Sequence, residues 1–233
     1  MSRTLNRSCC LLAALLAATC FGSNASASVV AWGAAQNTTG ASNVSTNGSL
    51  VAAFNGGGAN TTANGVLFTS SNVLGTSFVG ALNGGTTGDA GFDTLLNSFT
   101  FGGGTSTTID LGSFLVGALY EVQVFFADQR TPSIDRVMTY GSNDGLAGPT
   151  VNLEADSNNA PTSPFGQYAI GQFLADGADP DLTLATNGFA NAHINAWQVR
   201  LLREPVGVIP EASAGLIWSV LSLGACLKSR RAA

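Results

Sequence analysis

Between residues 28 and 204 the apolar residues occur in short runs, and clusters of Gly, Asn, Thr and Ser separate one run from the next. This pattern constrains the fold most, because runs of four to nine residues between turn-forming residues suit β-strands and are too short for a helical bundle. Glycine supplies 29 of the 233 residues, and only 10% of the chain is charged. Coiled coils and helical repeats need many charged helix formers, so the composition excludes them.

The sequence predicts an all-β fold, an antiparallel β-sandwich or jelly roll. Frequent turn signals between many short strands favour these architectures, and the strand–helix alternation of an α/β fold is missing. One short helix is expected over Phe92–Phe99, whose four apolar residues recur at helical spacing. The expected strands are Val29–Trp32, Ser49–Phe54, Gly65–Thr69, Thr107–Leu111, Tyr120–Ala127, Ile134–Tyr140, Thr150–Leu153, Gln167–Leu174, Leu182–Ala185 and Ile194–Leu202.

Two of the expected strands alternate clearly and are predicted to lie at the centre of a two-layer sandwich. In Tyr120–Ala127 the even-numbered residues share one face, since successive side chains of a strand point to opposite sides. In Ile194–Leu202 we expect Trp197 to face the core, and Gln198 and Arg200 to point outward. These two segments resemble strands of malectin-type and galactose-binding-like jelly rolls. That resemblance implies a sandwich fold and sugar binding.

Residues 1–27 have the three parts of a secretory signal peptide. Arg3 and Arg7 supply the positive start, Cys9–Phe21 is apolar, and Ala25–Ala27 fits a cleavage site with small residues. Cleavage there would make Ser28 the first residue of the mature domain, which we expect to span 28–204. A retained anchor helix is the alternative, but the apolar run is short and ends in small polar residues.

The C-terminus has three parts as well. Residues 205–212 form a linker containing Pro210 and Glu211, residues 213–227 form an uncharged apolar run, and residues 228–233 form a basic tail. The apolar run has 15 residues, somewhat fewer than the about 20 of a full transmembrane helix. Basic residues after such a helix favour the cytoplasmic side of the membrane. The basic residues are Lys228, Arg230 and Arg231.

A Pro-Glu pair, an apolar helix and a terminal basic cluster, in a chain with a signal peptide, resemble the PEP-CTERM sorting signal. Ala212 stands where the family has a second proline. The resemblance implies a bacterial exported protein that the C-terminal helix holds in the membrane only until an exosortase-like enzyme processes it. It also implies that Pro210 and Glu211 are recognised by that enzyme, and that the protein ends in the cell envelope or outside the cell.

The charge of the domain limits the kinds of partner that it can bind, and its cysteine content shows how it is stabilised. Residues 28–204 contain thirteen acidic residues, four arginines and no lysine, for a net charge of −9. Such a domain repels nucleic-acid phosphates and anionic lipids, which leaves divalent cations and neutral sugars as partners. All four cysteines lie outside this segment, so no disulfide is expected to stabilise the domain.

The domain has few of the residue types and motifs that catalysis needs, and we expect no enzymatic activity. His193 is the only histidine, and we expect it on the solvent side of the turn before the last strand. Zinc sites need several His or Cys ligands, and nucleophile-elbow, phosphate-loop and His-Glu-x-x-His motifs are absent. A glycoside hydrolase needs only two carboxylates, and Asp128 and Asp135 flank one strand–loop–strand corner, so this activity is kept as a distant alternative.

A candidate sugar site consists of Asp128, Arg130, Arg136 and Tyr140, which combine planar polar groups with an aromatic ring around one strand–loop–strand corner. The alternative is structural: Asp128 or Asp135 pairs with Arg130 or Arg136. The aromatic residues Tyr140, Phe165 and Phe189 then cap the edges of the sandwich.

A candidate Ca²⁺ site consists of Asp176, Asp179 and Asp181, three carboxylates in one loop beside Gly177. A solvated acidic hairpin tip is the alternative interpretation, and no other cofactor is expected.

The sequence thus favours an exported, non-enzymatic surface or matrix protein that binds extracellular polysaccharide. A purely structural envelope component without a discrete ligand is the alternative.

Overall fold

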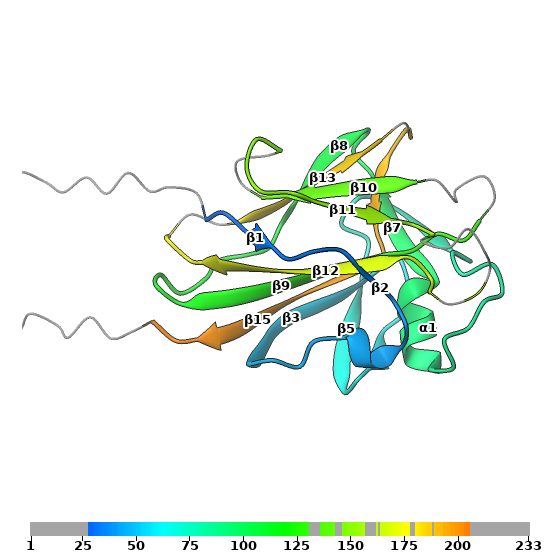
Figure 1. Ribbon diagram of the computed structural model, residues 1–233, viewed down its shortest axis with the longest axis horizontal. Helices are drawn as coiled ribbons and strands as arrows, with labels where there is room; N and C mark the ends of the chain where they lie inside the picture. Colours follow the sequence, from blue (N-terminus) through cyan, green and yellow to red (C-terminus); the bar gives the residue numbers. More distant parts are fainter. Residues whose placement is uncertain are drawn as a thin grey trace, which may run out of the picture.

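The computed structural model describes residues 28–130, 136–142, 146–156, 162, 164–177, 180–187 and 189–205. In this part the chain is mostly β, as predicted, with three sheets and one short α-helix (Figure 1). The signal peptide, the sorting motif at Pro210 and Glu211, the apolar run and the basic tail all lie outside the described residues. No helix in the described part is long and apolar enough to cross a bilayer.

The largest sheet has β9 (Leu119–Phe126) and β15 (Ala196–Arg203) next to each other at its centre, where the sequence predicted them. Its pairs are antiparallel, except that β3 and β5 pair in parallel. The order is β1 (Ala31–Trp32), β12 (Gln167–Leu174), β9, β15, β3 (Ser49–Gly56), β5 (Val66–Ser71) and β4 (Thr61–Ala63), and β2 (Gln36–Asn37) also pairs with β12.

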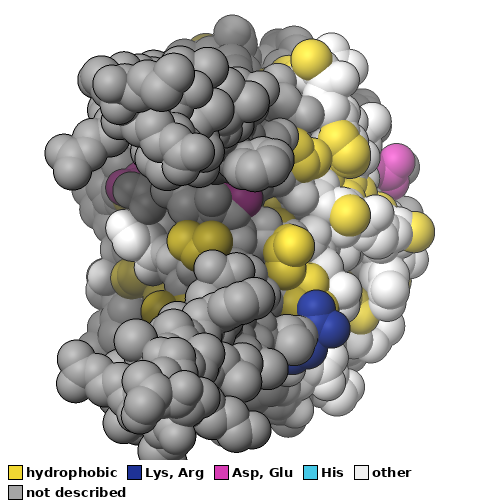
Figure 2. Space-filling view, turned by 90° about the vertical axis from the view of Figure 1, so that its left-hand side faces the viewer, with side chains coloured by type: hydrophobic (Ala, Val, Ile, Leu, Met, Phe, Trp, Pro, Cys, Tyr) yellow, Lys and Arg dark blue, Asp and Glu magenta, His cyan; other side chains and the backbone are white. Residues whose placement is uncertain are grey.

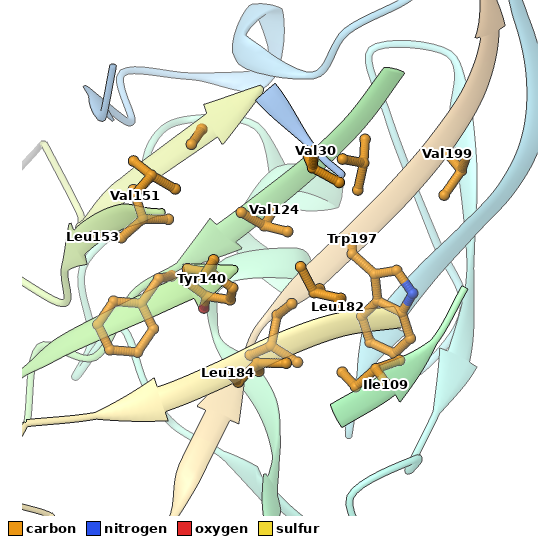
Figure 3. Close-up of a cluster of buried hydrophobic side chains, with 14 of the residues drawn as sticks. Val30, Ile109, Val124, Tyr140, Val151, Leu153, Leu182, Leu184, Trp197 and Val199 are labelled. Carbon is orange, nitrogen blue, oxygen red and sulfur yellow. The ribbon is translucent and has the colours of Figure 1, made fainter. Parts of the chain in front are cut away.

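A four-stranded sheet packs on one face of the large sheet, and the main core lies between them (Figure 3). Trp197 and Val124 of the large sheet meet Tyr140, Leu182 and Leu184 of the smaller one. The alternation predicted for β9 is confirmed here, since its even-numbered residues all belong to this core. The smaller sheet has the order β11 (Val151–Glu154), β10 (Val137–Gly141), β13 (Asp181–Thr186) and β8 (Ser106–Asp110).

The helix α1 (Ala90–Leu96) is shorter than predicted. Its first turn is capped by Asp89, whose carboxylate accepts a hydrogen bond of 2.8 Å from the Phe92 amide. The expected continuation to Phe99 is wrong, because residues Ser98–Gly102 form the strand β7 between β6 (Thr76–Val79) and β14 (Ala192–Ile194). Pairing with two distant strands thus decides the conformation of a segment whose local spacing also fits a helix.

The outer face of β9 and β15 is buried, contrary to the expectation that Gln198 and Arg200 point into solvent. The segment from the 3₁₀-helix η1 (Ala41–Asn43) to Gly48 crosses this face. Gln198 donates to the Gln123 side chain at 2.7 Å and to the Ser45 carbonyl, while Arg200 donates to the carbonyls of residues 47 and 48. These hydrogen bonds satisfy polar groups that burial would otherwise leave unpaired.

The described chain begins and ends at one end of the large sheet (Figure 1). Arg203 and Leu174 are both paired with Leu119, the first residue of β9. At the same end Ser28 is buried and donates a hydrogen bond of 2.8 Å to Asp176. Hydrophobic side chains are visible on this end of the molecule (Figure 2). The opposite end, where β9 finishes, carries the candidate site.

Candidate functional site

A hollow of about 350 Å³ opens near the end of β9, beside the three-stranded sheet. It combines aromatic rings with hydrogen-bonding groups, and it receives residues from four parts of the chain that are distant in sequence. Its described lining residues are Phe78, Phe99, Phe101, Arg130, Arg136, Phe189, Ala190, Asn191 and His193.

Asp128 holds the two arginines of the hollow in place. Its fully buried carboxylate accepts hydrogen bonds from Arg130 Nε at 2.7 Å and Arg130 Nη2 at 2.8 Å. Arg136 Nη1 donates to the same carboxylate at 3.1 Å. The structural alternative, in which Asp128 or Asp135 pairs with one of these arginines, is therefore confirmed for Asp128, which pairs with both, while Asp135 lies outside the described residues. Because one carboxylate faces two guanidinium groups, these three described side chains together keep one positive charge in a strongly acidic domain.

Aromatic rings support the flat faces of both guanidinium groups. The guanidinium carbon of Arg130 lies 3.9 Å from the ring centre of Phe78, and that of Arg136 lies 4.3 Å from the ring centre of Phe189. Each cation–π contact of this kind contributes about 0.5–1 kcal/mol at an exposed site. The rings therefore restrict the orientations of two long side chains, which fixes the directions in which their remaining N–H groups donate.

His193 is buried, so the expectation that it lies on the solvent side is wrong. Its ring lies 4.4 Å from the Phe99 ring in a stacked arrangement, and its Nδ1 is 3.2 Å from Arg136 Nη1. An arginine can only donate, so Nδ1 accepts, and the proton of the neutral ring is on Nε2. Burial, with further contributions from Arg136 and Arg130, holds the pKa of His193 well below its usual value of 6.5.

Two donors at the hollow are buried without a hydrogen-bond partner in the described part of the chain: His193 Nε2 and Arg136 Nε. Asn191 accepts a hydrogen bond of 3.3 Å from the Gly104 amide through its side-chain oxygen, and its amide nitrogen is a donor. Burial lowers the pKa of Arg136, but an arginine in a protein stays charged at neutral pH. The polar chemistry of the hollow is therefore dominated by donors.

The four residues of the predicted sugar site separate in the structure. Arg130 and Arg136 line the hollow, whereas Asp128 lies behind them with both carboxylate oxygens occupied by their N–H groups. Tyr140 belongs to the main core, fully buried, and its hydroxyl donates to the His193 carbonyl at 3.4 Å. Burial also raises the pKa of Tyr140 well above 10.0. The structure places Tyr140 next to His193 but not at the surface of the hollow.

Sequence reasoning did not find the phenylalanines of β6 and β7 or Asn191. The one local signal was the alternation in Ser98–Gly102, which puts Phe99 and Phe101 on the same face of a strand. Their neighbours come from the pairing of β7 with β14, which sets His193 opposite Phe101, and with β6, which sets Phe78 opposite Phe99. Neither pairing can be read from a single segment of the sequence.

The predicted calcium loop is only partly described. Asp176 accepts the hydrogen bond from Ser28, Asp181 is the first residue of β13, and Asp179 lies outside the described residues. In the part of the chain that the structure describes, no group of three or more His, Cys, Asp or Glu side chains is arranged to hold a metal ion.

Fold and site together define a mostly β domain with a donor-rich, ring-walled hollow at one end of its largest sheet. Comparison with protein-family models, with curated proteins and with solved structures gives no match for this chain. What the domain binds therefore has to be inferred from the chemistry of the hollow itself.

Proposed function

We propose that this chain is an exported bacterial surface protein whose β domain binds extracellular polysaccharide in the hollow. The observation that carries the proposal is the combination of phenylalanine rings with fixed guanidinium and amide groups around one cavity. Aromatic faces pack on the apolar face of a sugar ring, and planar polar groups fix the orientation of its hydroxyls. The volume of about 350 Å³ lies within the range of small-ligand sites.

The position of the hollow supports this role in a protein held by its C-terminus. The eight residues of β9 span about 25 Å at the usual rise of a strand, and they separate the hollow from the end at which Arg203 leaves the sheet. A C-terminal membrane helix would therefore hold the domain with the hollow facing away from the bilayer. Polysaccharide outside the cell could reach it both before and after release.

Binding is preferred over hydrolysis because of the residues around the cavity. Hydrolysis of a glycosidic bond uses two carboxyl groups on either side of the bond. Among the described residues, Asp128 is the carboxylate next to the hollow, and its oxygens are engaged by both arginines, while Asp135 lies outside the described residues. We also propose that the fold is a jelly roll of the galactose-binding-like kind, which is supported by the central pairing of the two strands that carry the resemblance.

The binding proposal is tested with full-length protein in mild detergent, titrated with a panel of bacterial exopolysaccharide fragments. Phe78→Ala removes a wall of the hollow and should weaken binding about tenfold, the loss of one good ring contact with its apolar area. Val79→Ala is the matched control, because Val79 is the next residue of β6 and is 64% exposed. Absence of binding by the unchanged protein would support the purely structural alternative.

The sorting proposal is tested separately, by intact mass of the protein from cell envelope and medium. We expect a released form that begins at Ser28 and ends near Pro210. Replacing Pro210 and Glu211 by alanine should keep the protein in the membrane with its C-terminus intact. Unchanged release of that double variant, or a native form that retains residues up to Ala233, would overturn the sorting proposal.

A further inference from the structure

We infer that the hollow selects an acidic sugar, whose ring carries one singly charged group such as the carboxylate of a uronic acid or a sulfate ester. The inference rests on the proposed sugar binding and adds the class of sugar. It differs from the expectation from net charge, which left neutral sugars as the partners of this acidic domain. Three features of the hollow support it: its local charge, its excess of donors and the fixed geometry of its guanidinium groups.

The local charge of the hollow is opposite to that of the domain. Two of the four arginines between residues 28 and 204 meet here, and among the described residues only Asp128 pairs with them, which neutralises one of the two positive charges. His193 adds no charge, because its ring is held neutral. Charges farther away than about 8 Å are largely screened at physiological ionic strength, so a ligand in contact with the arginines experiences mainly their charge.

The described lining of the hollow offers more hydrogen-bond donors than acceptors, which favours a ligand that brings acceptors. Arg136 Nε and His193 Nε2 have no hydrogen-bond partner in the described part of the chain, and both belong to residues that line the hollow. A neutral sugar hydroxyl satisfies such donors only singly and brings a donor of its own. A carboxylate or sulfate brings acceptor oxygens without a donor, and charged acceptors form the stronger hydrogen bonds with guanidinium groups.

The charge count also sets an upper limit on the ligand. The described residues of the cluster carry one uncompensated positive charge, which matches a monoanion, and a doubly charged phosphate would bring a second negative charge without a partner. The phenylalanine rings provide apolar surface beside the arginines, which suits a sugar ring that carries the acidic group. A free inorganic anion would leave these rings without a contact.

The test compares four ligands that differ at one position of the same sugar: a uronate, its neutral methyl ester, a sulfate ester and a phosphate ester. Full-length protein should bind the uronate or the sulfate about tenfold more tightly than the neutral ester, which is the contribution of one charge-assisted hydrogen bond. The phosphate should bind no better than the monoanions. The preferred monoanion identifies the source of the charge.

The variant Asn191→Asp tests the charge without removing an arginine. Aspartate has the shape of asparagine and keeps the oxygen that accepts from Gly104, so the fold should be retained. The added negative charge should lower affinity for the acidic sugar about tenfold more than it lowers affinity for the neutral ester, for which only the amide donor is lost. Asn152→Asp is the control, since exposed Asn152 lies on β11 outside the hollow and adds the same net charge.

The outcomes separate the two proposals. Equal binding of acidic and neutral sugars, unaffected by Asn191→Asp, would overturn the acidic-sugar inference and leave sugar binding in place. No binding of any of the four sugars would count against both at this site. Equal weakening by Asn191→Asp and Asn152→Asp would show a general effect of net charge and would overturn the inference as well. Selective weakening by Asn191→Asp is the result that we expect.

Discussion

The substitution Asp128→Asn tests whether one buried carboxylate organises the hollow. Asp128 is fully buried and accepts three side-chain hydrogen bonds from Arg130 and Arg136. Asparagine keeps the shape but loses the charge and places an N–H₂ group against donors. Removing one partner from a buried ion pair costs about 3–5 kcal/mol. The side chains of Arg130 and Arg136 are 31% and 16% exposed, so water recovers part of this, and we expect a loss of about 2–4 kcal/mol.

The loss can be measured by urea unfolding of full-length protein, followed by tryptophan fluorescence, to which buried Trp197 contributes. Domains of ordinary stability unfold with about 5–15 kcal/mol, so the variant should still fold, with a midpoint lowered by about 1 M urea or more. Glu154→Gln is the control, because Glu154 is exposed at the end of β11 and its loss should change stability by less than about 0.5 kcal/mol. If both variants unfold at the same urea concentration, Asp128 does not hold the arginines and the reasoning fails.

Three further substitutions test the packing and the burial of polar groups. Gly91→Ala lies in α1, where replacing glycine by alanine normally stabilises a helix by about 1 kcal/mol. Here the new Cβ would overlap the Thr62 carbonyl oxygen, so thermal unfolding should show destabilisation. A raised melting temperature would contradict this close contact. Gln123→Leu removes the side-chain oxygen that accepts hydrogen bonds from the Ser45 amide and from Gln198 on the buried outer face. Although it adds an apolar side chain, we expect it to lower the free energy of urea unfolding by about 2–4 kcal/mol. A neutral or stabilising effect would show that these hydrogen bonds contribute little. His193→Gln concerns pH: the folded pKa of His193 lies below its unfolded value, so its contribution to stability is present above about pH 6.5 and is lost as pH falls. The unfolding free energy of the unchanged protein should therefore fall toward pH 5 more steeply than that of the variant, by up to about 1.4 kcal/mol per pH unit, and parallel pH profiles would place a charged histidine in the folded state.

The strands that could be predicted are those whose pattern is local. The even-numbered residues of Tyr120–Ala127 had to share one face whatever the strand paired with, and the structure buries them in the main core. An ion pair between Asp128 or Asp135 and one of the arginines was among the alternatives that the sequence offered, because Arg130 is two residues from Asp128 and a short loop leads to Arg136. Short sequence separation limits the arrangements available to such groups.

Other features required the tertiary structure. Phe99 fits the helical spacing of the residues before it, yet pairing with β6 and β14 draws it into a strand. Gln198 and Arg200 sit at positions that alternate like solvent-facing ones, and they are buried only because residues 43–48 fold across them. The segment that covers these two side chains lies about 150 residues earlier in the chain, so no local sequence pattern predicts their burial.

The sequence by itself determined the many short strands, the acidic charge and the absence of cysteine from residues 28–204, because each of these follows from composition and local periodicity. Only the tertiary structure decided the hollow. Phe78, Phe99 and His193 meet through the registers of β6, β7 and β14. Arg136 contacts His193, although the two residues are 57 positions apart in the sequence. Strand registers are chosen by the packing of whole sheets, so a site built from several strands exists only once the sheets have formed.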